Sequence, residues 1–262
     1  RWWLVGSAWL GASDANGRST AADTPLSEPV ARALAGTKFD DRLRQLAVAE
    51  RMNTDVRRAV FCTVLDSADV LDACERLAKL GLSGKQEREI VHVLLHCVTR
   101  ERVYNPFYAQ LLSRLAVSNS QLRLAIQFSY WDKFRDMTTF GTRAIGHLAH
   151  ALAALLIADA ARLSVFRSVD WPSLSPKSLL FFRTTFRQLL VDSSLPRLQA
   201  LFGSVKIERS LRESLVLFLD IDFRRFVEQT LASMDNPPDD LDTIRKRLRL
   251  ALHCCSNVAA KQ

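Results

Sequence analysis

The 262-residue chain carries 36 Lys and Arg against 28 Asp and Glu, a net charge of +8. Hydrophobic residues make up 48% and charged residues 24%, as in ordinary soluble globular proteins. With only 9 Gly and 8 Pro, the sequence has too few turn residues for an all-β architecture, so we expect mostly helix.

The first segment, residues 1–37, is predicted to be an aromatic anchor peptide followed by a linker. Trp2, Trp3 and Trp9 lie in RWWLVGSAWL, and the residues after it are small, polar and interrupted by proline. Three tryptophans are costly to leave in water, so we expect them to dock on a surface that can lie outside this chain. The chain opens on Arg1 rather than Met, which indicates a piece of a longer protein.

From Lys38 onward the hydrophobic pattern predicts helices nearly to the end. Gly81 is expected to end one helix in a left-handed cap, and Ser83 with Gln86 to open the next as a capping box. Asn105-Pro106 is expected to start another helix. The remaining expected helices are 38–52, 54–66, 68–80, 119–136, 142–159, 176–192, 195–203, 207–233 and 239–255. Short connections between such helices predict an all-α fold, an α-solenoid of stacked antiparallel hairpins.

Two features of the sequence concern membrane insertion and the redox state of the cysteines. The longest apolar stretch, 144–158, contains Gly146, His147 and His150 and is too short for a bilayer span, so we interpret it as a core helix. The five cysteines are widely spaced without a CxxC pair, which is typical of reduced thiols packed as small hydrophobes.

No common catalytic motif is present: the sequence lacks a P-loop, a strand-linked GxGxxG, GxSxG and HExxH. His92 and His96 lie four residues apart and could share a zinc ion, but no third ligand stands out. We therefore predict no enzyme activity, no cofactor, no metal and no small-molecule substrate. A metal hydrolase using this histidine pair is the competing hypothesis.

An acidic stripe follows the helix that begins near Ser67. Asp66, Asp69, Asp72 and Glu75 recur every three residues, so they lie along one side, and the first two also suit the positive end of the helix dipole. Capping and solvation are one interpretation. The other is an interface that pairs with arginines of a partner protein.

Positive charge concentrates in two places. Residues 100–199 hold 13 basic and 6 acidic groups, against 6 and 7 in residues 54–99. We expect surfaces of opposite sign, although an excess that only aids solubility is the alternative. The second place is the run Arg245, Lys246, Arg247 and Arg249, a candidate RNA or phosphate contact. Acidic Asp239, Asp240 and Asp242 precede it, so complementarity to the helix dipole also explains the run.

Three ordered blocks resemble the MI domain, a helical-repeat domain of initiation factor 4G and related MIF4G-domain proteins. They are RMNTDVRRAVFCTVLDSADVLDACERLAKLGLSGKQEREIVHVLLHC (51–97), ERVYNPFYAQLL (101–112) and FSYWDKFRDM (128–137). With RWWLVGSAW (1–9) added, the chain resembles the C-terminal part of the nucleolar MIF4G-domain proteins. This resemblance assigns 38–194 to the MI domain and 195–262 to a helical extension packed on it, after a MIF4G domain that this chain lacks.

The resemblance implies a nuclear, nucleolar scaffold for assembly of the small ribosomal subunit. The implied partners are pre-ribosomal proteins, pre-rRNA and a DEAD-box helicase of the initiation-factor-4A type, held mainly by the MIF4G domain; no membrane partner is implied. In other MI domains an aspartate of a Ser-x-Asp turn takes part in helicase binding, and Ser67-Ala68-Asp69 matches that turn. Tyr104, Asn105, Pro106 and Tyr108 match a motif to which we assign a structural role. A cytoplasmic translation regulator with the same domain is the alternative.

Overall fold

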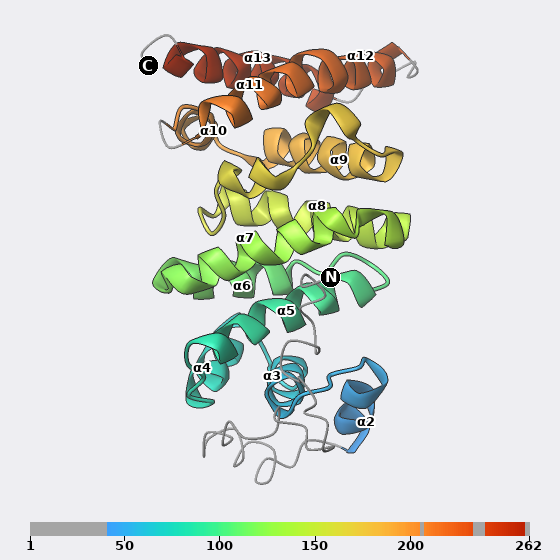
Figure 1. Cartoon of the computed structure of the whole chain (residues 1–262), viewed down its shortest axis with the longest axis vertical. Coiled ribbons are helices and arrows are strands. Elements are labelled where there is room, and N and C mark those ends of the chain that lie inside the picture. Colours follow the sequence, from blue (N-terminus) through green and yellow to red (C-terminus); the bar gives the residue numbers. More distant parts are fainter. Residues whose placement is uncertain (1–40, 205–206, 233–238, 260–262) are drawn as a thin grey trace, which may run out of the picture.

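The computed structural model describes residues 41–204, 207–232 and 239–259, and every regular element within them is helical (Figure 1). The α-helices are α2 (Asp41–Ala49), α3 (Asp55–Leu65), α4 (Val70–Lys79), α5 (Lys85–Arg100), α6 (Phe107–Ser118), α7 (Ser120–Arg135), α8 (Thr142–Ile157), α9 (Pro176–Asp192), α10 (Leu195–Phe202), α11 (Arg209–Leu217), α12 (Arg224–Ala232) and α13 (Asp239–Ala259). Three short 3-10 helices, η3 (Met137–Thr139), η4 (Leu163–Ser168) and η5 (Trp171–Ser173), and the π-helix η6 (Phe218–Phe223) complete the set. The all-α prediction is confirmed.

The helices stack along the long axis of the molecule, from α2 at one end to α13 at the other (Figure 1). Helices α3, α5 and α7 pack side by side in one layer, and α4, α6 and α8 do so in a second layer. Each hairpin therefore gives one helix to each layer, which confirms the predicted solenoid. At the C-terminal end, α13 packs on α9, α10 and α11.

The core lies between the two layers, and α8 contributes many of its fully buried residues. Leu148, Leu152, Leu155 and Leu156 of this helix have no exposed surface, so the interpretation of 144–158 as a core helix is confirmed. Among the described residues, no helix combines the length and apolar character that crossing a bilayer requires.

An aromatic cluster continues the core toward the C-terminal end. Phe166 of η4 packs against Phe134 of α7 and against Phe182 and Phe186 of α9, with ring centroids 5.6–6.2 Å apart. Phe218 of η6 lies 5.7 Å from Phe186. The core thus runs through the boundary predicted between 194 and 195, and that domain division stays a prediction.

The observed helix ends can be compared with the three predicted caps. Gly81 has φ +60° after α4, which confirms the left-handed cap. The start predicted at Asn105-Pro106 is wrong by one residue. Asn105 Oδ1 accepts a hydrogen bond from Phe107 N at 3.0 Å, but Pro106 is the N-cap of α6, because its carbonyl oxygen accepts the bond from Gln110 N. The capping box of Ser83 and Gln86 is wrong. Gly84, with φ +55°, is the N-cap of α5, and Gln86 N donates to the Ser83 carbonyl oxygen at 3.1 Å rather than to its hydroxyl.

Most predicted bounds lie within three residues of the observed ones. The predicted helix 207–233 is a continuous run of α11, η6 and α12, with the π-helix in its middle. The anchor peptide and linker at 1–37, and the start of the predicted helix 38–52, lie outside the described residues.

Candidate protein and nucleic-acid interfaces

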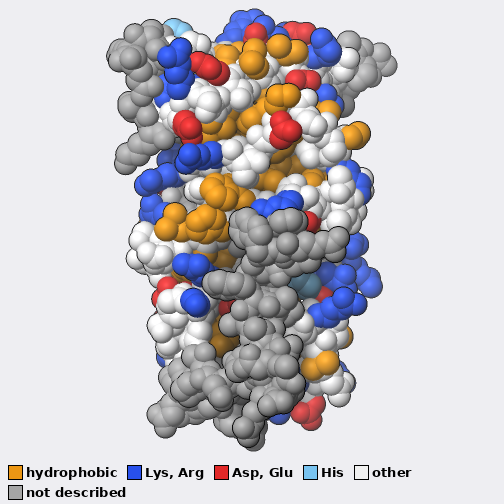
Figure 2. Space-filling view, viewed as in Figure 1, with side chains coloured by type: hydrophobic (Ala, Val, Ile, Leu, Met, Phe, Trp, Pro, Cys, Tyr) orange, Lys and Arg blue, Asp and Glu red, His pale blue; other side chains and the backbone are white. Residues whose placement is uncertain are grey.

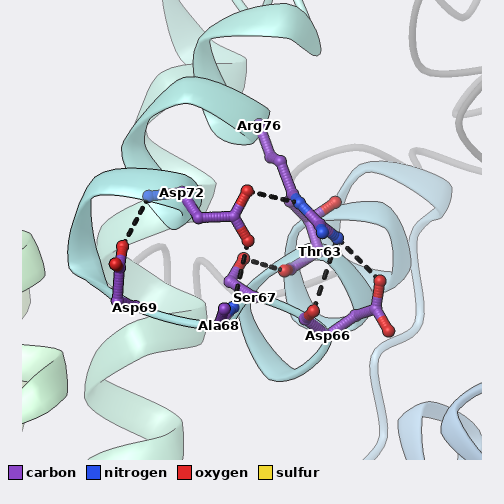
Figure 3. Close-up of polar contacts among 7 residues, drawn as sticks. All are labelled: Thr63, Asp66, Ser67, Ala68, Asp69, Asp72 and Arg76. Atoms are coloured by element: carbon purple, nitrogen blue, oxygen red, sulfur yellow. Dashed lines mark hydrogen bonds and ion pairs between the residues drawn. The ribbon is translucent and has the colours of Figure 1, made fainter.

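Asp66 and Asp69 of the acidic stripe lie in the turn between α3 and α4, and Asp72 lies in the first turn of α4 (Figure 3). Asp69 is the N-cap of α4 in an extended conformation, and its Oδ1 accepts a hydrogen bond from Asp72 N at 2.8 Å. This bond satisfies one of the backbone donors that every helix start leaves unpaired. The Asp69 side chain is exposed, so its carboxylate caps the helix and also faces solvent.

Arg76 ties the other two aspartates of the stripe together. Its Nε donates to Asp72 Oδ1 at 2.8 Å and its Nη1 to Asp66 Oδ2 at 2.7 Å (Figure 3). Asp72 Oδ2 also accepts a hydrogen bond from Ala68 N at 3.0 Å. We call Asp66, Asp72 and Arg76 the arginine clamp. Within it both carboxylates have an internal counter-ion, although Asp66 is exposed, as are Asp69 and Glu75 outside the clamp.

Electrostatics of the turn agree with this geometry. The hydrogen bond from Ala68 N, followed by the bond and charge of Arg76, lowers the pKa of the Asp72 carboxyl. The two carboxylates raise the pKa of Arg76. Asp72 and Arg76 are therefore both charged at neutral pH, and the clamp fixes the shape of the turn that presents Asp69.

The basic run on α13 divides into two sets. Arg247 Nη1 donates to the carbonyl oxygens of Leu190 and Val191 at 2.6 Å, so this guanidinium caps the end of α9. Arg245, Lys246 and Arg249 are exposed. Arg245 and Arg249 line a hollow of about 270 Å³ together with Arg224 of α12, and Glu228 supplies one negative charge there. These exposed cations suit a phosphate, whereas Arg247 is held by the fold.

Basic side chains are also prominent on the face seen in Figure 2, where Lys and Arg lie along both edges of the solenoid and hydrophobic side chains are exposed between them. Phe128 and Leu124 of α7 are each 46% exposed.

The histidine pair has an ordinary structural explanation. His96 Nε2 lies 2.9 Å from Glu50 Oε2, and the same carboxylate oxygen forms an ion pair with Arg100 Nε at 2.8 Å. His92 is exposed. Among the described residues no group of three or more His, Cys, Asp or Glu could hold a metal ion. The described part of the chain therefore offers the metal-hydrolase hypothesis no third ligand.

The cysteines pack as the sequence predicts. Cys62, Cys97 and Cys255 are buried, Cys74 and Cys254 are half-buried, and all five are free thiols. Burial raises the pKa of Cys97 to about 12 and that of Cys255 to about 11. Thiols with such pKa values are poor nucleophiles at neutral pH.

Sequence reasoning missed a groove of about 590 Å³ lined by residues of α6, α8 and α9. It begins at Tyr104, whose ring packs against His150 with centroids 5.2 Å apart, and Pro106 also lines it. Tyr108, which belongs to the same sequence motif as Tyr104 and Pro106, does not line the groove. Its side chain is buried and donates a hydrogen bond to Glu101 Oε1 at 2.7 Å. No local motif could reveal the groove, because its walls come from helices far apart in the chain.

Trp2, Trp3 and Trp9 lie outside the described residues, so their docking stays a prediction. The aspartates and the basic run are far apart in the stack, in the α3–α4 turn and on α13 (Figure 1). The sequence-predicted residues therefore form two separate candidate interfaces, one acidic and one basic.

Comparison with known proteins supplies the family context. A sequence model of the MA3 domain matches residues 56–162, which run from α3 to just past α8. Nucleolar MIF4G domain-containing protein 1 of Homo sapiens is 36% identical over 99% of the chain, and that of Mus musculus is 40% identical over 84%. Suppressor of glycerol defect protein 1 of Schizosaccharomyces pombe is 31% identical over 86%. The chain spans 25–30% of the length of these relatives.

Proposed function

Since this chain contains an MA3 domain and belongs to the family of nucleolar MIF4G domain-containing proteins, we propose that it is a non-enzymatic scaffold in assembly of the small ribosomal subunit. The human and mouse relatives are named as nucleolar proteins, and on the basis of this similarity we assign the chain to the nucleolus. A cytoplasmic translation regulator, the alternative, has no such support.

The observation that carries the proposal is the exposed Asp69 carboxylate on a turn held by the arginine clamp. Because Asp66 and Asp72 are paired with Arg76, the shape of the turn does not depend on a partner. A fixed exposed carboxylate is a good acceptor for an arginine or lysine of another protein. The partner proposed for this turn is a DEAD-box helicase of the initiation-factor-4A type, with the main helicase contact on the MIF4G domain of the whole protein.

The second arm of the proposal concerns pre-ribosomal RNA. Arg224, Arg245 and Arg249 surround one hollow at the α12–α13 end, and Lys246 is exposed beside them. A cluster of this kind suits contact with the phosphate backbone and carries no preference for base sequence. The acidic turn and the basic hollow would let one rigid stack hold a protein and an RNA together.

The proposed helicase contact is tested with variants that separate the capping role of Asp69 from its charge. Asp69→Asn keeps a side-chain oxygen for Asp72 N but removes the charge, whereas Asp69→Ala also removes the cap and should cost about 1 kcal/mol of stability. We expect Asp69→Asn to weaken binding of a purified helicase of this type by about tenfold with little change in Tm.

Asp170→Asn, a change at another exposed aspartate, is the matched control and should bind normally. Unchanged helicase binding in Asp69→Asn would leave Asp69 with a capping role alone. The scaffold itself is tested by sedimentation from cell extracts: the protein should travel with small-subunit precursors, and its presence only with polysomes would refute the proposal.

A further inference from the structure

The groove that begins at Tyr104 is lined by residues of α6, α8 and α9. Apolar residues that line it, which we call its floor, are Ala109 of α6, Ala154 and Ile157 of α8, and Ala158 at the end of α8. A second hollow of about 210 Å³ shares His150 and Gln188 with it and continues to Phe226 of α12. The two hollows are therefore adjacent, and α6, α8, α9 and α12 line them together; we call the pair the alanine groove.

The charge along the alanine groove is mainly positive. Arg114 lines one end, and Arg183 and Arg187 line the other. Arg114 and Arg187 are exposed, and within the described part of the chain neither has an ion pair or a hydrogen bond. The one lining carboxylate, Asp192, accepts a hydrogen bond from the Gln188 side chain. Burial, and then the neighbouring His147 and Arg187, lower the pKa of His150, so this ring is neutral at neutral pH.

Arg183 is positioned by the fold. Its guanidinium carbon lies 5.1 Å from the centroid of the Phe226 ring, which fixes the side chain across α9 and α12. A cation held in place over an aromatic ring loses less conformational entropy when it meets an acidic ligand. Together with Arg114 and Arg187, it places positive charge at both ends of an apolar floor.

We propose that the alanine groove binds an acidic peptide segment of a partner protein, with aliphatic side chains on the floor and carboxylates on Arg114 and Arg187. Charge complementarity selects this occupant. The chain's own aromatic segment, RWWLVGSAWL, contains a basic residue and no acidic one, so it does not match the arginines. This interface is distinct from the proposed helicase contact, because Asp69 is not among the residues that line the groove.

Single-stranded RNA fits the groove less well. Bases bind such channels by stacking on open aromatic faces. Here the Tyr104 ring is packed on His150, and Arg183 covers the ring of Phe226. The floor offers methyl groups instead, which suit aliphatic side chains.

The test is a selection of random peptides displayed on phage against the whole chain, followed by fluorescence anisotropy on the selected sequences. Two independent variants disable the groove. Arg114→Glu with Arg187→Glu reverses its charge, and Ala158→Phe fills its floor from an exposed position at the end of α8. Circular dichroism checks that each variant folds.

Matched controls make the same chemical changes at exposed positions that do not line the groove: Arg143→Glu on α8 and Ala78→Phe on α4. We expect the selected peptides to be rich in Asp or Glu with aliphatic residues between them. Their affinity should fall about tenfold or more in both groove variants and stay unchanged in the controls and in Asp69→Asn.

Several results would overturn the proposal. One is a selection that enriches no peptide, or peptides without acidic residues. Another is equal affinity of the selected peptides for the wild-type chain and the groove variants. A third is a labelled poly-uridine strand that displaces the peptides and loses its own binding in the groove variants, since that would make RNA the ligand.

Discussion

Asp72 and Arg76 lie one turn apart on α4, and Arg76 Nε donates a hydrogen bond to Asp72 Oδ1 at 2.8 Å. Pairs at this spacing usually add little to the stability of an exposed helix. Here the same guanidinium also reaches Asp66, ten residues earlier and before the helix begins. The pair therefore fixes the turn that precedes α4 as well as the helix itself.

The clamp makes stability depend on pH. The pKa of Asp72 is lowered from its ordinary value of about 3.9 by the Ala68 N–H and by Arg76. A carboxyl with a lowered pKa stabilises the fold above its unfolded-state pKa, and this contribution is lost as pH falls through the folded-state value. We predict that wild-type protein loses more stability than Asp72→Asn between pH 5 and pH 3, as measured by urea unfolding. Parallel losses in the two proteins would show that Asp72 makes no net contribution.

Much of the fold follows from the sequence because helix periodicity is a local signal. The spacing of apolar residues placed α9 at 176–192, the range that the structure shows, and Gly81 ends α4 as a left-handed glycine should. The capping box predicted at Ser83 is wrong because α5 begins one residue later than that pattern requires. Gly84 takes a positive φ, which glycine adopts without strain, and α5 begins directly after it. Ser83 is therefore one residue too far from the helix to be its N-cap.

The candidate sites were less predictable because they depend on contacts between distant residues. The Ser-x-Asp pattern identified Asp69, but nothing in it showed that Arg76 pairs with both Asp66 and Asp72. The run at 245–249 reads as one basic strip, yet Arg247 turns inward to carbonyl groups more than fifty residues away. The alanine groove is a product of stacking, and no part of the chain carries a pattern for it.

RNA binding by the α12–α13 hollow should respond to salt. We predict that Arg245→Glu with Arg249→Glu weakens binding of a single-stranded RNA and reduces the salt dependence of its affinity. Two lost phosphate contacts should lower the slope of log K against log salt by about 1.4. Filter binding at several salt concentrations measures this slope, with Arg143→Glu as the control. Wild-type binding that does not depend on salt would exclude phosphate contact as its basis.

The aromatic cluster predicts that residues 195–262 are needed for the stability of what precedes them. Phe218 is 4% exposed, and its ring centroid lies 5.2 Å from that of Trp171 and 6.1 Å from that of Phe182. We expect Phe218→Ala to cost about 3–5 kcal/mol of unfolding free energy. Calorimetry of the whole chain should give one transition, and a chain truncated after 194 should melt at a lower temperature. Two transitions, with the first alone shifted by Phe218→Ala, would instead show that the extension folds separately.

Substitution of Arg247 tests how α13 is held against α9, because this side chain of α13 caps the end of α9. Its Nη1 contacts two carbonyl groups at the end of α9, where the helix dipole is negative, and the side chain is half-buried. Hydrogen bonds from a charged donor are worth about 1.5–3 kcal/mol, so Arg247→Ala should lower the unfolding free energy by about 2 kcal/mol. Lys246→Ala, at the adjacent exposed position, should change it by less than about 0.5 kcal/mol. Hydrogen exchange should locate the loss in the amides of α13 and of the last turn of α9, because those are the two elements that Arg247 joins. If both variants behave alike, the guanidinium contributes nothing to docking, and Arg247 returns to the set of cations available for RNA.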